Sequence, residues 1–317
     1  MLTLAQAKQL SQDKLTQEVI DEFRQSAFMD ALPFDDNAKA QGESMTYVYN
    51  RITTQPTAQS RAINGEYTAQ ETVTTQQVAT LGIFGGSYQV DRVLIKHEKQ
   101  VVDHIDFQSK QKAKAGRAKF LDLLINGNKA VDAKEFDGLN KIVTGSTTDI
   151  TITPLIDLST QALIKANAEN LLYGLRQLIK NMDGVTHLLM NRDAFAVFQS
   201  VSDVIPNVSY TRDTLGNVTY FYGSARIEDL GDKPGTTNPI IPTDVDGKTD
   251  IYAVRVGLDG VHGVSPDGAN LISLYYPDMK APGAVKTGEV EAVAAVVAKT
   301  TKSVGVLRGI KVVTPQG

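Results

Sequence analysis

Two stretches of alternating apolar and polar residues flank a segment that is almost wholly polar. Residues 45–53, MTYVYNRIT, are rich in tyrosine and β-branched residues and predict a strand, and a second strand is predicted around residues 72–84. Between them, residues 54–72 have hardly any apolar side chain except Ile63 and Tyr67. An isolated hairpin is only marginally stable in water, and this one has almost nothing apolar to bury. The pattern therefore predicts a long hairpin that its own domain does not stabilise.

Composition leaves two interpretations of this hairpin open. A long loop inside a compact domain is usually either functional or disordered, and a polar surface loop fits the second description. If the loop is ordered, something outside its own domain must hold it, and a neighbouring copy of the chain is the simplest partner. In that case Arg61, Ile63 and Tyr67 are the candidate contact residues of an intersubunit loop.

A glycine-rich stretch, GIFGGSYQVDR (82–92), follows the second strand. Gly82, Gly85 and Gly86 do not fit a GxGxxG fingerprint, and no Lys–Ser/Thr pair follows them as in a P-loop. Asp91, at the start of the next predicted helix, also opposes the binding of a phosphate there. Because glycine has a permissive backbone, we predict instead a hinge at these three glycines, between the loop and the helix.

The longest helical pattern covers residues 91–125, which contain one glycine and no proline. Asp91 is a good N-cap, and Asn126-Gly127 is a typical C-terminal stop. At 1.5 Å per residue this helix would be a rod of about 50 Å, much longer than the usual globular helix.

The rest of the pattern mixes helices and strands and predicts an α+β protein. The elements predicted after residue 125 are a turn and strand at 135–143, helices at 155–181 and 192–201 around a buried strand at 187–191, strands in VTYFYG, ARIEDL, DIYAVRVG and LISLYYP within 205–285, and strands within 290–314. Residues 290–299 could alternatively be helical. Short helical patches before residue 30 end by Pro33.

Composition narrows the class of protein. The 317 residues suit two subdomains, and 42% hydrophobic with 21% charged residues is typical of a soluble globular protein. A net charge of −4 gives no overall basic field that would attract nucleic acid or membrane. Because the chain has no cysteine, disulfides, Cys-ligated zinc, iron–sulfur clusters and thiol catalysis are excluded. We expect no signal peptide and no membrane span, since no apolar run reaches the roughly 18 residues needed.

The candidate chemistry is sparse. His97 and His104 would lie about 10 Å apart along the predicted helix, too far to share a metal, and Val101 stands where a zincin motif would have its second histidine. The stretch TDVDGKTD lacks the ligands of an EF-hand, and its Asp246-Gly247 pair favours a hairpin turn. There is no GxSxG motif and no outstanding pair of carboxylates. We therefore predict no catalytic residue, no metal site, no cofactor and no enzymatic activity.

One basic cluster lies in the second half of the long predicted helix. Its members are Lys110, Lys112, Lys114, Arg117 and Lys119. They could form a solvated face, or they could contact a polyanion or an acidic neighbour. No aromatic residue is interleaved with them, so sequence-specific recognition of nucleic acid is not predicted.

The order of these parts resembles the major capsid protein of tailed bacteriophages, which has the Hong Kong 97-like (HK97-like) fold. The segment TTQQVATLGIFGGSYQVDRVL resembles that family's passage from an extended loop into a spine helix, and EFDGLNKIV resembles the short turn after it. HLLMNRDAFAVFQSV resembles the strand and helix of the axial domain. VEAVAAVVAKTTKSVGVLRGIKV resembles the closing strands, with Gly309 and Ile310 in place of the family's proline-aromatic pair.

The resemblance implies an α+β, HK97-like capsid fold in four parts. These are an N-terminal arm at 1–45, an extended β-hairpin loop at 46–90, a peripheral domain with the spine helix at 91–149 and 285–300, and a mixed α/β axial domain at 150–284 and 301–317.

The resemblance also implies a function, a structural protein that self-assembles into an icosahedral shell around phage DNA. The implied partners are further copies in pentamers and hexamers, scaffolding, portal or decoration proteins, and packaged DNA in non-specific contact, without a membrane. The implied location is the virion, after assembly in the cytoplasm of a bacterial host. An encapsulin-type nanocompartment shares the fold but encloses enzyme cargo. A soluble α/β enzyme with a disordered loop at 54–72 is the third hypothesis, and it predicts a monomer or small oligomer.

Overall fold

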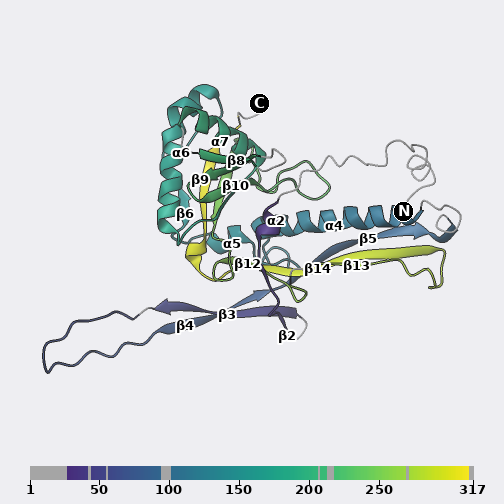
Figure 1. Ribbon diagram of the computed structural model, residues 1–317, viewed down its shortest axis with the longest axis horizontal. Coiled ribbons are helices and arrows are strands. Elements are labelled where there is room, and N and C mark those ends of the chain that lie inside the picture. The colour runs from purple at the N-terminus through teal and green to yellow at the C-terminus, as the bar shows by residue number, and fades with distance from the viewer. Residues whose placement is uncertain are drawn as a thin grey trace.

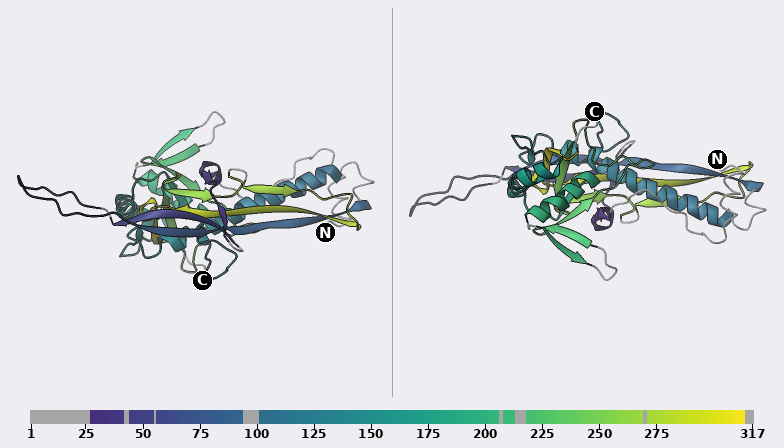
Figure 2. Two further views of the ribbon diagram at one scale, coloured as in Figure 1. Left: turned by 90° about the horizontal axis from the view of Figure 1, so that it is seen from below. Right: turned by 90° about the horizontal axis from the view of Figure 1, so that it is seen from above.

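The computed structural model has three parts that extend in different directions from one junction (Figure 1). An upright body of helices and strands stands above the junction, a long arm extends to one side, and a two-stranded hairpin extends to the other. Seen from above or below, the hairpin and the arm follow nearly one line (Figure 2). The residues that the structure describes are 27–41, 44–54, 56–93, 101–205, 208–212, 218–268 and 271–313.

The arm is a sheet that one long helix covers. β5 (Gly82–Asp91) runs antiparallel to β14 (Val285–Ala298) over the whole length of β5. Side chains along β5 alternate between buried and exposed, and the buried ones face α4 (Val101–Asn126). Among them, the Tyr88 hydroxyl lies 2.7 Å from the hydroxyl of Ser109 on the helix. This alternation is why the segment is a strand that packs against a helix on one face.

The same sheet continues into the junction through shorter strands. β13 (Ile272–Tyr275) and β12 (Val261–Val264) both run antiparallel to β14. β1 (Phe34–Asp35), which follows α2 (Phe28–Ala31), pairs in parallel with β12. The N-terminal part of the described chain is therefore built into the sheet of the arm.

The junction has an aromatic core centred on Phe120 of α4. Its ring centroid lies 5.6 Å from that of Phe34, 6.2 Å from that of Phe84 and 6.0 Å from that of Phe136. These rings come from the N-terminal segment, from β5 and from the turn after α4. Burial of such large rings is the main term that holds the four segments together.

The body is built on a seven-stranded sheet. In spatial order its strands are β6 (Asp149–Thr151), β15 (Val304–Lys311), β11 (Lys248–Val254), β7 (His187–Met190), β10 (Ala225–Asp229), β9 (Val218–Tyr222) and β8 (Val208–Arg212). A 3₁₀ turn, Thr301–Ser303, joins β14 to β15. The chain thus passes from the arm into the body between its last two strands.

Two amphipathic helices cover this sheet, and each begins at a side-chain cap. The Thr160 hydroxyl accepts from the backbone N–H of Leu163 at the start of α6 (Gln161–Asn181), and Asn191 caps α7 (Arg192–Val204) in the same way. α6 packs on β15 and α7 on β10. Gly174 allows close packing of α6, because a Cβ there would force the end of the Ile152 side chain to shift.

A group of hydrogen bonds from one arginine, Arg308, connects the body to the base of the arm. Arg308 on β15 donates from Nε to Asp149 at 2.5 Å, and from Nη1 to Asn140 on α5 (Leu139–Val143) at 3.0 Å and to Asp250 at 3.3 Å. Burial raises the pKa of the Asp250 carboxyl, although Arg308 acts in the opposite direction. One guanidinium thus bridges three elements that are far apart in the sequence.

Replacing this arginine should cost stability. We expect Arg308→Met to lower the free energy of unfolding by about 2–4 kcal/mol, because it leaves two half-buried carboxylates without their cation. Urea unfolding of the dissociated subunit measures the change. Lys110→Met is the matched control, since its pair with Asp106 is exposed to solvent and should contribute far less to stability than the Arg308 bonds. Equal losses in the two variants would contradict the bridging role of Arg308.

Most elements predicted from the sequence are confirmed, with three corrections. Residues 135–143 form a turn and the short helix α5 rather than a turn and strand, because Leu139 and Val143 both face the core at helical spacing. Residues 290–299 lie mainly in strand β14, so the helical alternative is wrong. The helix predicted at 155–181 begins only at Gln161. α4 ends at Asn126 as predicted, whereas residues 94–100 of that prediction lie outside the described residues.

Candidate assembly surfaces

The predicted hairpin is present, and it projects beyond the rest of the chain (Figure 1). β3 (Ser44–Thr54) and β4 (Val73–Thr80) pair antiparallel, and β2 (Lys39–Gln41) adds a third strand next to β3. Every residue from 56 to 72 is exposed. The hairpin therefore has the property that its polar sequence indicates: its tip buries nothing within its own chain.

Two of the three candidate contact residues lie together at this tip. The guanidinium carbon of Arg61 is 5.4 Å from the ring centroid of Tyr67. Arg61 Nη1 also donates to the carbonyls of Ala62 at 3.3 Å and Gly65 at 3.2 Å. Ile63, at the same tip, is 92% exposed. The tip is thus a small ordered turn that presents one cation, one aromatic ring and one aliphatic side chain, and their contact with a neighbouring copy stays a prediction.

One face of the hairpin stem also presents apolar side chains. Val48 on β3 lies directly opposite Val78 on β4, and both are exposed. Ile52, on the same face of β3, is 61% exposed. Adjacent exposed aliphatic side chains on a projecting element are typical of a surface that another molecule covers.

The opposite face of β3 anchors the hairpin to the junction. Arg51 donates from Nε to the carbonyl of Lys299 at 3.0 Å and from Nη2 to that of Ala298 at 2.9 Å. The Tyr47 hydroxyl donates to the Asp35 carboxylate at 2.9 Å, and burial together with this carboxylate raises the pKa of Tyr47. We call this contact zone the hairpin root.

Sequence reasoning missed the hairpin root. The available signal was the alternation in YVYNR, which places Tyr47, Tyr49 and Arg51 on one face of a strand. Their partners, Asp35 and the carbonyl of Ala298, are distant in sequence and could not be paired with them from a single chain.

The three glycines are not at a break between the loop and the helix. Gly82, Gly85 and Gly86 all lie inside β5 and pair with β14. A Cβ at Gly85 would overlap the carbonyl oxygen of Val290, so the close approach of the two strands accounts for that glycine. The interruption lies one residue earlier, at Leu81, which separates β4 from β5. A hinge role for the glycines stays a prediction, and their assumed position is corrected.

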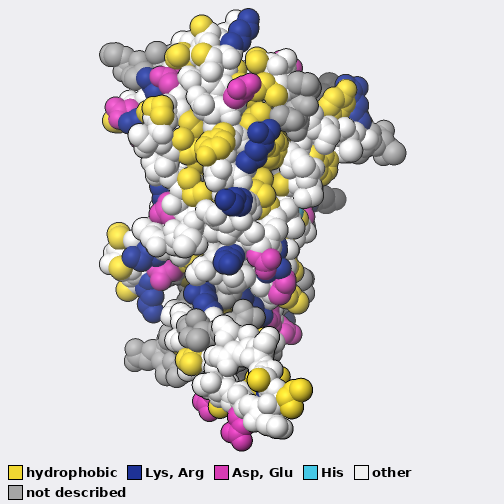
Figure 3. Space-filling view, turned by 90° about the vertical axis from the view of Figure 1, so that its left-hand side faces the viewer, with side chains coloured by type: hydrophobic (Ala, Val, Ile, Leu, Met, Phe, Trp, Pro, Cys, Tyr) yellow, Lys and Arg dark blue, Asp and Glu magenta, His cyan; other side chains and the backbone are white. Residues whose placement is uncertain are grey.

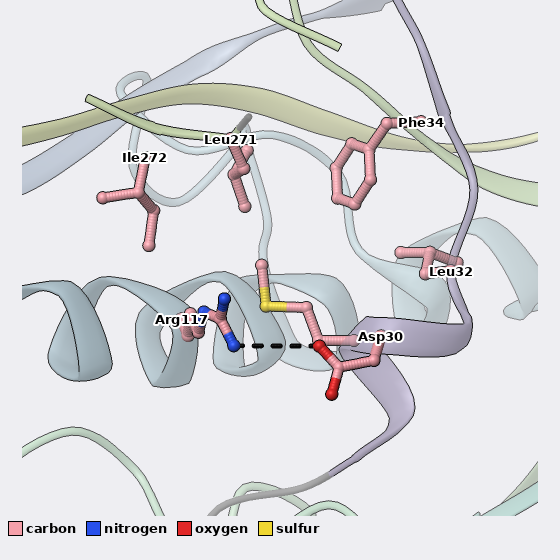
Figure 4. A pocket seen from close by; sticks show the side chains of 7 residues that line it. Asp30, Leu32, Phe34, Arg117, Leu271 and Ile272 are labelled. Carbon is pink, nitrogen blue, oxygen red and sulfur yellow. Dashed lines mark ion pairs between the residues drawn. The ribbon is translucent and has the colours of Figure 1, made fainter. Parts of the chain in front are cut away.

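A cavity of about 370 Å³ lies between the N-terminal segment, α4 and β13 (Figure 4). Its apolar walls come from Met29, Leu32, Phe34, Leu271 and Ile272. Its two charged groups, Arg117 on α4 and Asp30 on α2, face each other at 3.7 Å. Because these two charges are paired with each other, the arrangement offers apolar contact and no obvious acid–base chemistry.

Members of the basic cluster on α4 are paired with acidic side chains of the same chain. The ion pairs are Lys110–Asp106 at 2.6 Å, Arg117–Asp30 at 3.7 Å, Lys119–Asp122 at 3.5 Å and Lys119–Glu135 at 3.4 Å. The Lys112 side chain lies over Gly86 of β5. These pairs favour the solvated-face interpretation over a track for polyanions.

The described residues contain no group of three or more His, Asp or Glu side chains that could hold a metal ion. The Asp246-Gly247 pair lies in a turn before β11, as predicted, with the Gly247 N–H donating to the Asp244 carbonyl at 3.0 Å. His97 lies outside the described residues, and the side chain of His104 is not described. Within the part of the chain that the structure covers, no helix is long and apolar enough to cross a membrane.

His187 should make the stability of the subunit depend on pH. Burial, with a smaller contribution from Arg226, lowers the pKa of His187 to about 4. The unfolded chain binds a proton below about pH 6.5, whereas the folded chain does not until about pH 4. As the pH is lowered from about 6.5 to about 4, the free energy of unfolding should therefore fall, by at most about 1.4 kcal/mol per pH unit. Urea unfolding at pH 7 and pH 5 measures the slope. His187→Gln should reduce it, and an unchanged slope would contradict the assignment.

Comparisons with solved structures give matches along the whole chain. The holo-SrpI encapsulin complex from Synechococcus elongatus PCC 7942 matches with a TM-score of 0.68 and 13% identity, covering 100% of this chain and 99% of that chain. The capsid of a native GTA particle matches with a TM-score of 0.63 and 9% identity, covering 98% and 99%. A chain of Gordonia phage Cozz matches with a TM-score of 0.60 and 14% identity, covering 97% and 94%. The sequence matches no protein-family model and no curated protein.

Proposed function

We propose that this chain, which has the HK97-like fold of phage capsids and encapsulins, is the repeating subunit of a closed protein shell. The predicted α+β, HK97-like fold is confirmed at full coverage, whereas the division at residues 1–45, 46–90, 91–149 with 285–300, and 150–284 with 301–317 stays a prediction. Similarity of fold alone does not determine function, so the proposal rests on a feature of this chain.

The observation that carries the proposal is the projecting hairpin. Residues 56–72 are exposed throughout, and the end-on view of the molecule shows them as a mostly polar protrusion below the body (Figure 3). An ordered segment without a core of its own is stabilised when it lies on another molecule. Because each copy of the chain carries the same hairpin, a second copy is the simplest molecule to receive it.

Such a contact would be head-to-tail, since the hairpin of one copy meets a different surface on the next. Head-to-tail contacts close into rings when the rotation between copies allows it. Repetition around rings of five and six, the pentamers and hexamers of an icosahedral shell, gives a container. In this arrangement Arg61, Ile63 and Tyr67 would contact the neighbouring subunit, and packaged DNA would meet the inner wall without sequence-specific recognition.

Such a shell could enclose either of two kinds of cargo, DNA or an enzyme. In a phage capsid, assembled in the cytoplasm of a bacterial host and located in the virion, the shell would hold DNA and work with scaffolding, portal or decoration proteins. An encapsulin-type compartment would hold enzyme cargo, and the encapsulin match with a TM-score of 0.68 supports this alternative. Nuclease-resistant DNA in particles from their natural source would favour the capsid, and a co-purifying enzyme would favour the compartment. In neither case would the shell subunit itself be an enzyme.

Negative-stain electron microscopy of the chain expressed alone tests the proposal. We expect rings of five or six copies, tubes or closed particles. Isolated 34.3 kDa monomers over a wide range of salt, pH and protein concentration would instead agree with the soluble-enzyme hypothesis.

A further inference from the structure

The hairpin root covers a buried histidine. His262 lies on β12 with its side chain fully buried, and the ring of Tyr47 on β3 packs against it edge-on, with 5.8 Å between ring centroids. The same tyrosine donates its hydroxyl hydrogen bond to Asp35. The hairpin is therefore attached to the junction directly above an imidazole.

Neither ring nitrogen of His262 has a hydrogen-bond partner of normal geometry in the structure. The Gly260 carbonyl favours a protonated ring, but it also accepts from the backbone N–H of Lys299 at 3.1 Å and supplies no counter-charge. A buried imidazolium needs an acceptor or a counter-ion, and without one its burial costs several kcal/mol. The site as folded therefore favours the neutral ring over the charged one.

The charged groups around the ring do not offset this cost. The carboxylates of Asp35 and Asp259 favour a proton on His262, but Asp35 is held by Tyr47, and Asp259 pairs with Arg255 at 2.6 Å. The Lys299 ammonium, which lies 5.8 Å from the centroid of the Tyr47 ring, opposes the proton. Burial is the largest effect and lowers the pKa of His262 below its ordinary value of 6.5.

We propose that His262 is an acid-sensitive latch: its neutral ring supports the hairpin root, and its protonation releases the root. A proton taken from water onto either ring nitrogen creates a charge that must be hydrated. Water can reach the ring if Tyr47 lifts away, which breaks its hydrogen bond to Asp35. The bonds from Arg51 to the carbonyls of Ala298 and Lys299 lie on the same face of β3 and would be lost with it. The hairpin would then turn at Leu81, where β4 ends and β5 begins.

The absence of cysteine allows this movement to be measured directly. Thr75→Cys on β4 and Gln161→Cys at the start of α6 are both exposed positions for spin labels. Labelled chains, diluted into a large excess of unlabelled chains so that only distances within one chain are read, would be studied by pulsed electron resonance between pH 7 and pH 4.5. We expect a reversible change in the distance distribution as the pH falls, with the helical circular dichroism signal unchanged.

The variant His262→Phe keeps an aromatic ring under Tyr47 and cannot take up a proton. It should hold the distance distribution of pH 7 at every pH, whereas His187→Gln, which removes a half-buried imidazole far from the hairpin root in sequence, should behave as the original chain does. A movement with the same midpoint in His262→Phe, or no movement in the original chain, would overturn the proposal.

A second measurement needs no variant. Exchange of the imidazole C2 hydrogen, followed by mass spectrometry of the peptide that contains His262, reports the exposure and titration of that ring. Because the intrinsic exchange rate itself falls below the pKa of an imidazole, each rate is divided by that of free imidazole at the same pH. This relative rate should be very low at pH 7 and should rise with the same pH midpoint as the distance change. If the hairpin moves while His262 stays protected from exchange, the latch is excluded, whatever the folding behaviour of the His262→Phe chain.

Discussion

Deleting residues 56–70 should abolish assembly and leave the subunit folded. All of these residues are exposed and bury no part of the core, so their loss removes little of the folding free energy. Thr54 and Val73 pair across the hairpin, and residues 55, 71 and 72 would remain to close it with a three-residue loop. Circular dichroism and urea unfolding should be near those of the original subunit, whereas light scattering should detect only small species. Shells that form unchanged would contradict an intersubunit role for the tip.

A pair of single substitutions gives a matched control for this deletion. Ile63 at the hairpin tip and Val245 in a turn of the body are 92% and 93% exposed, respectively. Ile63→Ser should weaken assembly because it removes an apolar contact with the next copy, and Val245→Ser should not. Neither should alter the stability of the isolated subunit by more than about 0.5 kcal/mol. Equal effects on assembly would mean that the tip is no more important than any other exposed site.

Gly85→Ala should destabilise the arm strongly, whereas Gly86→Ala should have little effect. A Cβ at position 85 would overlap the carbonyl of Val290, a backbone atom that cannot move alone, so we expect a loss of at least about 2 kcal/mol in urea unfolding. At position 86 the nearest atom is the flexible end of the Lys112 side chain at 3.4 Å, and the change should be less than about 1 kcal/mol. These values apply to the dissociated subunit.

The same two variants separate packing from the hinge that the glycines were predicted to form. If the glycines serve as a hinge, both variants should slow expansion of assembled shells without changing the unfolding free energy of the subunit. If position 85 is glycine because β5 packs closely on β14, only Gly85→Ala should have an effect. That effect should be a lower unfolding free energy of the subunit.

The sequence was informative where local pattern and burial agree. The buried strand predicted at 187–191 and the helix predicted after it follow from an apolar run and helical spacing, and both are present as β7 and α7. The hairpin followed from two alternating segments around a polar one. In both cases neighbouring residues alone decide the structure.

The sequence was misleading where the reason for a residue lies far along the chain. Gly85 suggests flexibility when it is read beside its neighbours, and its explanation is the carbonyl of Val290 on β14. The hairpin root depends on Asp35, on β12 and on the end of β14, which only the folded chain brings under Tyr47. Residues 135–143 were predicted as a turn and strand, yet the core below them accepts the helical pair Leu139 and Val143.

The central claim is that the hairpin tip of each chain lies on another copy, and a cross-linking measurement tests it most directly. A photoreactive amino acid would replace Ile63 in particles assembled from a mixture of chains labelled with light and heavy nitrogen. Mass spectrometry of the cross-linked peptides then shows whether the two partners came from one chain or two. We predict that pairs of mixed isotopic composition will be abundant. Cross-links that join only peptides of the same isotopic label would show that the tip lies on its own chain, and they would contradict the shell account.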